Sequence, residues 1–172
     1  MMAPQTIEAS LGHDCVGRVY FFAWQDRIAH SVEIQQNGSS QIWESVEGND
    51  QQDWPPSPPF QNLSIQRIRE SDVALLVGMA GKSHWSLSVD IDAERGSIRF
   101  DVACRITTDA GQLRSTYRCP SVAAVECLVV TGNGSTIRQL ENQWCVEPDS
   151  VDYSATVRWI YDFKFGAGPA NK

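Results

Sequence analysis

The sequence predicts an all-β fold: a single-domain antiparallel β-barrel or a curved β-sandwich of about ten strands, with at most one or two short helices. From Val16 onward, apolar and polar residues alternate with a period of two, which is typical of strands that bury one face. Turn-forming residues interrupt this alternation about every ten positions, as in antiparallel all-β domains. A chain of 172 residues fits one domain that buries roughly 70% of its unfolded surface.

The first two predicted strands form a hairpin, and its two-residue turn sets the register. These strands are residues 16–24 and 27–35. Pairing Trp24 with Arg27 places Phe21 opposite His30, on the face that we assign to the interior. An Asn-Gly turn then leads into a third strand, because these residue types tolerate the positive φ angles of tight hairpins. The third strand spans residues 41–48.

A Pro-rich loop follows over residues 49–62, where four prolines remove amide donors and favour a surface path. Strands then resume with the same alternation. They span residues 63–70, 72–81, 84–92, 97–105, 113–119, 122–130 and 153–165. Apolar side chains occupy every second position of the last segment, so we expect a long strand that lines the core.

Residues 135–144 are ambiguous, and we expect a short helix there. Ile137, Leu140 and Trp144 have helical spacing, and Ser135 is a favourable helix cap. A strand is the alternative, because β segments surround this stretch. The domain is expected to span residues 12–166, after an N-terminal extension over 1–11 and before a frayed tail over 167–172.

A closed barrel removes exposed sheet edges, and the strong first and last strands are suited to pair and close it. The pattern resembles the architecture of lipocalin-like barrels by analogy alone, since the chain carries no motif of that family. A sandwich is the main alternative.

Composition and spacing exclude several classes of partner. The chain has 14 Lys and Arg against 21 Asp and Glu, a formal net charge of −7 without any basic run, so we expect no nucleic-acid partner. Without a secretion signal or an apolar run of ~20 residues, we expect no membrane segment and a cytoplasmic location. Five widely spaced cysteines favour free thiols. No zinc or phosphate-loop spacing occurs, so no metal or cofactor is expected.

The hairpin of residues 83–105 has a four-residue loop in which Gly96 takes the left-handed position, and this loop sets Ile91 opposite Ile98. A similar loop ending at Gly111 is expected to pair residues 97–105 with 113–119. The same registers predict two structural pairs of opposite charge: Asp90 with Arg99, and Asp101 with Arg118.

Carried across both turns, these registers place like charges side by side. His84, Arg105 and Arg114 form one row on the polar face, with Arg118 and Tyr117 nearby. Such neighbours repel unless an anion or a carboxylate lies among them, and arginine forks suit carboxylate and phosphate groups. We therefore predict an anion-binding patch at these five residues. The alternative is that the arginines extend into solvent and pair with loop acids.

Two further residues are candidate ligand contacts. The imidazole of His30 is expected inside the fold and needs a polar partner there, either Ser45, Glu44 or a bound ligand. Trp54 lies among prolines on the long loop, where it could cover a barrel mouth or contact a partner protein. Ordinary burial in the core is the simpler interpretation of both.

The preferred function is a soluble binding protein that holds a small acidic or lipid-like ligand in or beside the barrel. One alternative is an interaction module that docks a partner protein through the Trp54 loop or a sheet edge. The other is an enzyme with a dispersed site, which is less favoured because the sequence shows no local catalytic motif.

Overall fold

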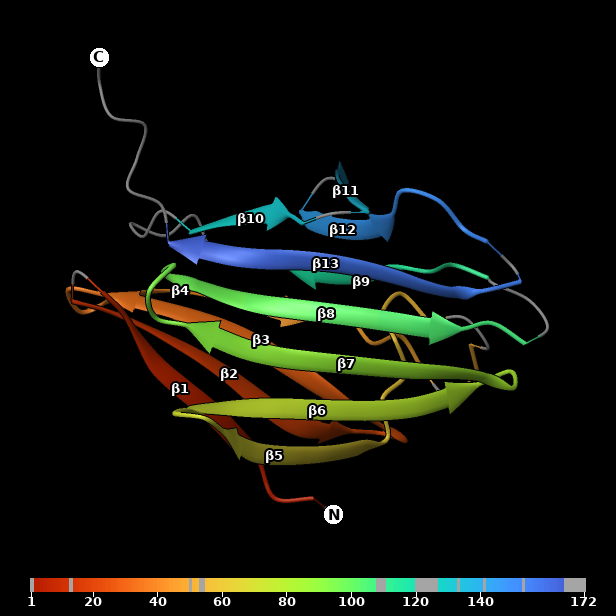
Figure 1. The fold of residues 1–172 in the computed structure, drawn as a ribbon, viewed down its shortest axis with the longest axis horizontal. Helices are drawn as coiled ribbons and strands as arrows, with labels where there is room; N and C mark the ends of the chain where they lie inside the picture. Colours follow the sequence, from red (N-terminus) through yellow and green to blue (C-terminus); the bar gives the residue numbers. More distant parts are fainter. Residues whose placement is uncertain are drawn as a thin grey trace.

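The computed structural model (Figure 1) describes the chain with several gaps. The described residues are 2–12, 14–49, 51–52, 55–107, 111–119, 127–132, 134–140, 142–152 and 154–165. Over these residues the fold is all-β, with thirteen strands in two antiparallel sheets and no helix.

The larger sheet has seven strands and the smaller has six. In spatial order, the larger sheet contains β1 (Gln5–Gly12), β2 (Cys15–Trp24), β3 (Arg27–Gln36), β4 (Ser39–Ser45), β9 (Ser115–Arg118), β12 (Gln143–Pro148) and β11 (Ser135–Leu140). The smaller contains β10 (Cys127–Thr131), β13 (Thr156–Phe165), β8 (Ser97–Arg105), β7 (Ser83–Asp92), β6 (Ser71–Ala80) and β5 (Asn62–Ile68).

The sheets lie face to face and do not close into a barrel. Figure 1 shows β5 to β8 and β13 in front, with β1 to β3 crossing behind them at an angle. The expected closure between the first and last long strands is wrong, because β13 pairs with β8 and β10 instead of β2. The arrangement is consistent with the β-sandwich alternative.

The short hairpins have the predicted registers. Trp24 pairs with Arg27 and Phe21 with His30 across β2 and β3. In the β7–β8 hairpin, Ile91 pairs with Ile98, and Gly96 has a φ of 58°. Local turn chemistry therefore determines these pairings.

The predicted pairing of β8 with β9 is wrong. β9 lies in the other sheet, between β4 and β12. The free edge of β8 pairs with β13 over nine residue pairs, whereas β9 is only four residues long. The longer alternating strand β13 therefore occupies the position beside β8 that was predicted for residues 113–119.

Two other segments differ from the sequence-based expectation. Residues 135–144 contain β11 and the start of β12, which pair as a hairpin with Leu140 opposite Gln143, so the short helix is wrong. β12 also pairs with β9, so it forms backbone hydrogen bonds with a strand on each side. This pairing outweighs the helical spacing of the apolar residues. The N-terminal segment forms β1, an edge strand in which Ile7 pairs with Val19. The expected tail at 167–172 lies outside the described residues.

The middle of the Pro-rich segment is also not a surface loop, since residues 55 and 57–60 are buried, whereas the described residues at its two ends (49, 51, 52, 61 and 62) are exposed. Phe60 is 2% exposed, and its carbonyl accepts a hydrogen bond of 2.7 Å from the Ile28 amide. The Ser57 hydroxyl accepts a bond from the Thr116 amide and donates to the Thr116 carbonyl. This segment therefore connects the two sheets and helps to fill the space between them.

The core lies between the sheets and is rich in aromatic side chains. Phe100 stacks on Tyr161 with ring centroids 5.2 Å apart, and Phe163 lies edge-on to Phe100 at 5.5 Å. Trp159 is fully buried. All five cysteines are free thiols.

Candidate functional site

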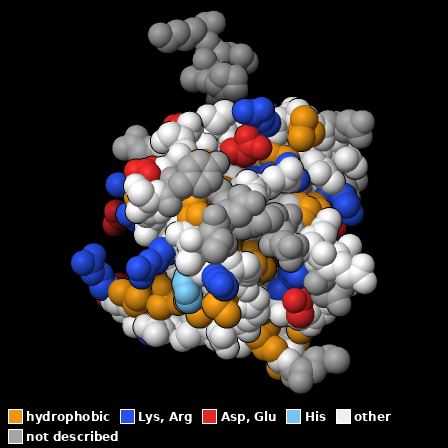
Figure 2. All heavy atoms as spheres, turned by 90° about the vertical axis from the view of Figure 1, so that its right-hand side faces the viewer, with side chains coloured by type: hydrophobic (Ala, Val, Ile, Leu, Met, Phe, Trp, Pro, Cys, Tyr) orange, Lys and Arg blue, Asp and Glu red, His pale blue; other side chains and the backbone are white. Residues whose placement is uncertain are grey.

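The outer face of the six-stranded sheet carries an open hollow of about 540 Å³, which we call the basic hollow. Strand alternation turns His84 and Arg105 outward, and the two residues are direct partners across β7 and β8. Its lining residues are Gln61, Asn62, Val77, Gly78, Met79, His84, Trp85, Ser86, Ala103, Arg105 and Thr156. Figure 2 shows this end of the molecule, where a histidine lies among Lys or Arg and hydrophobic side chains.

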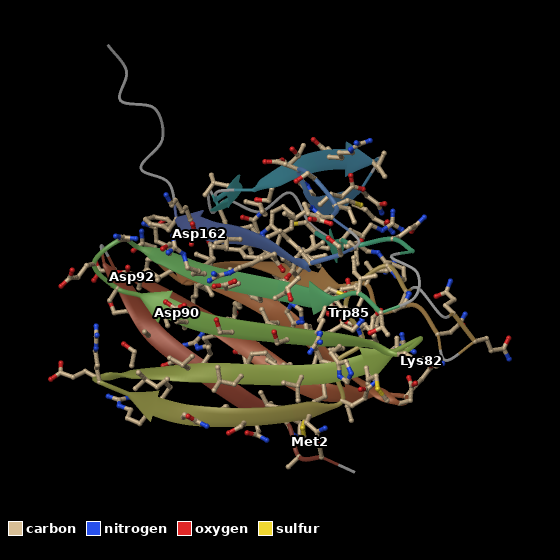
Figure 3. All side chains as sticks on the ribbon, turned by 45° about the vertical axis from the view of Figure 1, so that its right-hand side comes forward. Met2, Lys82, Trp85, Asp90, Asp92 and Asp162 are labelled. Atoms are coloured by element: carbon tan, nitrogen blue, oxygen red, sulfur yellow. The ribbon has the colours of Figure 1, made fainter. Side chains whose placement is uncertain are left out.

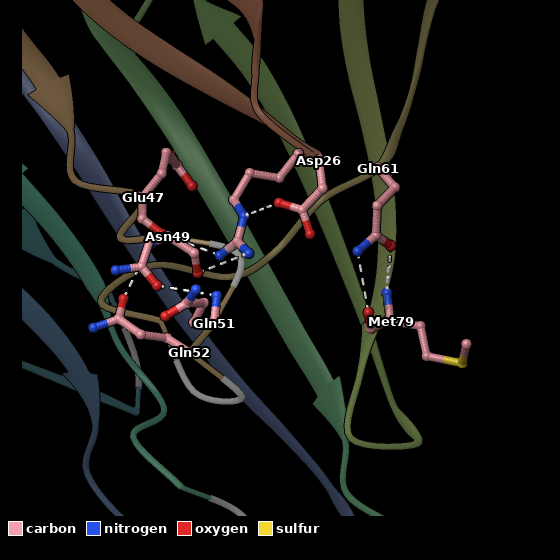
Figure 4. Close-up of polar contacts among 8 residues, drawn as sticks. Asp26, Glu47, Asn49, Gln51, Gln52, Gln61 and Met79 are labelled. Atoms are coloured by element: carbon pink, nitrogen blue, oxygen red, sulfur yellow. Dashed lines mark hydrogen bonds and ion pairs between the residues drawn. The ribbon is translucent and has the colours of Figure 1, made fainter.

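One rim of the basic hollow is fixed by main-chain contacts. The Gln61 amide group donates to the Met79 carbonyl at 3.1 Å and accepts from the Met79 amide at 2.7 Å (Figure 4). Gly78 lacks a side chain where the Pro-rich segment passes, since a Cβ there would lie 2.0 Å from the Pro59 carbonyl oxygen. The close approach of these two segments therefore shapes the hollow.

The hollow also has an apolar side. Val77 and Met79 project outward from β6 and are 51% and 56% exposed. Neither residue was predicted as a site residue from the sequence. The sequence did contain a signal for them. Within residues 72–81, apolar side chains occupy both alternating sets of strand positions. One set therefore faces outward unless a second layer covers it.

Charge is unevenly distributed along this sheet face. Lys82 lies at the β6–β7 turn, whereas Asp90, Asp92 and Asp162 lie toward the other end of the strands (Figure 3). Within the described chain, no carboxylate forms an ion pair with His84 or Arg105. Among the described residues, the Arg105 guanidinium of the basic hollow therefore has no ion-pair partner, and the His84 imidazole lies beside it.

The other charged pairs on this face are structural, with partners that differ from the prediction. Arg99 is a strand partner of Asp90, but its ion pair is with the buried Asp162, at 3.0 Å. Asp101 accepts a bond of 2.6 Å from the Nε of Arg158 on β13. The predicted pair of Asp101 with Arg118 is wrong, because these residues belong to different sheets.

Of the five residues in the predicted anion patch, the structure brings only His84 and Arg105 together. Arg118 lies on the seven-stranded sheet opposite Glu44. Tyr117 is fully buried between the sheets. Arg114 precedes β9, and its buried Nε has no hydrogen-bond partner among the described residues. The row of three cations does not form, because it depended on the pairing of β8 with β9.

A second hollow of about 480 Å³ adjoins the first on the same face. The two share the lining residues Val77, Ser86 and Ala103. Its charged lining residues are Asp101 and Arg158, which are paired with each other. The shared residues make a continuous groove whose basic end is at His84 and Arg105.

His30 lies inside the fold, as predicted, but its ring partner was missed. Its Nε2 lies 2.8 Å from the Tyr117 hydroxyl, which lies 2.7 Å from the Tyr161 hydroxyl. The predicted partner Ser45 instead accepts a bond from the His30 backbone amide at 2.9 Å. The ring stacks on Phe100 at 5.4 Å, and burial lowers the pKa of His30 to about 3. Its side chain lines neither hollow, so ordinary core packing accounts for it.

Two buried cysteines have thiols that stay protonated at neutral pH. Burial raises the pKa of Cys104 and of Cys127 to about 12, which leaves little of the reactive thiolate. Over the described residues, no three His, Cys, Asp or Glu side chains are placed to hold a metal ion. The same part of the chain contains no helix of the length and apolarity needed to span a bilayer. Trp54 lies outside the described residues.

Comparison of this chain with protein-family models, with curated proteins and with solved structures finds no significant match.

Proposed function

We propose that the protein is a binding protein for a small amphipathic acid, which it holds at the basic hollow. The ligand has an oxyanion head, a carboxylate or a phosphate, and an apolar body. The observation that carries this proposal is the pairing of His84 with Arg105, without any carboxylate partner in the described chain, beside the exposed side chains of Val77 and Met79.

Each half of the ligand has a complementary surface. A guanidinium donates two parallel hydrogen bonds to a carboxylate or phosphate, and the adjacent imidazole supplies a further donor. Apolar atoms of the ligand would cover the side chains of Val77 and Met79, which stabilises binding by about 25 cal/mol per Å² removed from water. A hollow of about 540 Å³ lies within the usual size range of small-molecule sites.

Calorimetric titration with decanoate, decyl phosphate and decanol tests this proposal. We expect both anions to bind, and decanol to bind at least about tenfold more weakly because it cannot engage a guanidinium by charge. Arg105→Gln should weaken decanoate binding by about tenfold or more. Arg95→Gln is the matched control, since Arg95 lies in the β7–β8 turn at the far end of the sheet, beside Asp92.

Two results would overturn the proposal. One is equal affinity for decanoate and decanol, which would remove the role of the anion. The other is equal weakening by Arg105→Gln and Arg95→Gln, which would attribute the effect to net charge alone.

A second candidate, a protein-interaction module, is favoured by a separate observation. β5 is an edge strand, and large apolar side chains are exposed on β5 and β6, namely Ile68, Val77 and Met79. Edge strands bind extended segments of partner proteins by adding a strand. Ile68→Lys separates the candidates, because it should abolish such pairing and leave decanoate binding unchanged.

A further inference from the structure

The outer face of the seven-stranded sheet carries a separate pocket of about 450 Å³ where β4 ends. We call it the Arg118 pocket. Strand alternation turns Phe22 and Trp24 of β2 outward, and both side chains line the pocket. Phe22 pairs with Ala29 on β3, and the short side chain of Ala29 leaves room beside the Phe22 ring. Glu44 on β4 and Arg118 on β9 are the other lining residues that matter here.

Glu44 and Arg118 place opposite charges side by side in this pocket. They are direct partners across β4 and β9, and both are exposed. The residues that precede them, Trp43 and Tyr117, are buried between the sheets. Because successive side chains of a strand point to opposite faces, the charged groups of Glu44 and Arg118 face the outer side, where the pocket lies.

Neither of these charges is matched within the fold. Over the described residues, Glu44 and Arg118 form no ion pair, with each other or with any other residue. Their other strand partners are neutral, namely Ser31 beside Glu44 and Gln143 beside Arg118. Exposed ion pairs contribute little to stability in water. A ligand that binds between the two side chains therefore displaces no strong interaction.

The aromatic side of the pocket is accessible to a ligand. Trp24 is 47% exposed, and Phe22 is half-buried. Small-molecule sites combine apolar and aromatic walls with a few polar groups that orient the ligand. Aromatic rings of a ligand pack favourably against such side chains, either offset-stacked or edge-on. The Arg118 pocket therefore offers one aromatic surface and two charges of opposite sign.

We propose that the Arg118 pocket binds a free aromatic α-amino acid in its zwitterionic form. The ligand carboxylate accepts hydrogen bonds from the Arg118 guanidinium, the ligand ammonium donates to the Glu44 carboxylate, and the ring packs against Phe22 and Trp24. Cβ atoms of directly opposed strand residues lie about 5 Å apart, and both charged groups of an α-amino acid are attached to one carbon atom. The ligand can therefore engage both side chains at once.

A ligand with a single charge fits this pocket less well. A lone carboxylate at Arg118 would be repelled by Glu44, and a lone ammonium at Glu44 would be repelled by Arg118. The zwitterion meets an opposite charge at each end. The Arg118 pocket thus differs from the basic hollow, which lies on the other sheet and is proposed to take an anion.

Calorimetric titration of the whole protein at pH 7 tests this proposal with L-phenylalanine, phenethylamine and 3-phenylpropanoate. The three probes share the ring, but only phenylalanine carries both charges at this pH. We expect phenylalanine to bind at least about tenfold more tightly than either analogue, because each analogue lacks one charge-assisted hydrogen bond. L-alanine has both charges without the ring and should bind at least about tenfold more weakly than phenylalanine.

Variants assign each charge of the ligand to its partner. Glu44→Gln should weaken phenylalanine binding by about tenfold and remove its advantage over 3-phenylpropanoate. Arg118→Gln should weaken it similarly and remove its advantage over phenethylamine. Glu8→Gln and Arg138→Gln are the matched controls, since these residues lie on β1 and β11, the edge strands of the same sheet. They should leave phenylalanine binding unchanged, as should Arg105→Gln in the basic hollow.

The proposal is overturned if phenylalanine does not bind to the wild-type protein, or binds no more tightly than either single-charge analogue. These comparisons need no variant. Equal weakening by Glu44→Gln and Glu8→Gln, or by Arg118→Gln and Arg138→Gln, would also contradict it, because net charge alone would then explain the effect. Loss of phenylalanine binding in Arg105→Gln would place the ligand at the basic hollow instead.

Discussion

At the residue scale, the interior is organised by a short chain of polar side chains that connects the two sheets. His30 on β3, Tyr117 on β9 and Tyr161 on β13 lie within hydrogen-bond distance in series. Each is at least 96% buried, so none of them has water as a substitute partner. Losing one member therefore leaves its neighbours with unsatisfied polar atoms.

Tyr117→Phe is expected to destabilise the fold by about 1–3 kcal/mol, because it removes the shared hydroxyl between His30 and Tyr161. Urea unfolding measures this change. Tyr20→Phe is the matched control, since its hydroxyl bonds Glu33 on the outer face and its loss should cost under about 1 kcal/mol. Equal effects of the two changes would argue against a special role for the buried chain.

Glu47→Gln should change how stability depends on pH. In the folded protein, burial raises the pKa of Glu47 from 4.5 to about 7, so stability is lost as the pH rises from 4.5 through 7, by about 3 kcal/mol in total. Burial lowers the pKa of His30 from 6.5 to about 3, so its contribution instead grows with pH between 3 and 6.5.

In the wild-type protein these two trends cancel between about pH 4.5 and 6.5. Glu47→Gln removes the first trend only. We therefore expect its free energy of unfolding to keep rising up to pH 6.5, whereas that of the wild type stays flat and then falls. Urea unfolding at several pH values from 4 to 8 measures both curves, and parallel curves would contradict the buried, shifted carboxyl.

At the element scale, strands joined by short turns were predictable, and strands joined by long connections were not. The turn at Gly96 determines how β7 meets β8, because few backbone geometries close so short a loop. Nothing local determines whether β8 next meets β9 or β13. That choice depends on which strand covers more of the β8 edge. The apolar alternation within one segment does not show which distant segment it will pair with.

The Pro-rich segment lies in close contact with β6 at Gly78. Gly78→Ala should destabilise the protein by about 2 kcal/mol or more, because the new Cβ would collide with the main chain at Pro59 and Phe60. Gly38→Ala is the control, since no atom lies within 4 Å of its Cβ position and only its positive φ is unfavourable. Its cost should be about 1 kcal/mol. Thermal unfolding compares the two, and a neutral Gly78→Ala would show that the segment does not pack on β6 as described.

At the scale of the whole molecule, the two sheets present two different surfaces. The six-stranded sheet has a groove with a basic end at His84 and Arg105, and the seven-stranded sheet has a pocket where β4 ends, lined by Phe22, Trp24 and Arg118 among others. A net charge of −7 predicted neither location. The pair His84 and Arg105 was predictable because one hairpin carries both residues. The pocket on the seven-stranded sheet was not, because its walls come from strands brought together only by the fold.

The most direct test of ligand binding at the basic hollow is a ¹⁵N NMR titration with decanoate that maps where the ligand lies. We predict that amide shifts concentrate at residues 77–79, 84–86, 103–105 and 156, which surround the hollow, and that Arg105→Gln abolishes them. Shifts centred on the seven-stranded sheet or on the interior around His30, or unchanged shifts in Arg105→Gln, would contradict an anion site on the six-stranded sheet.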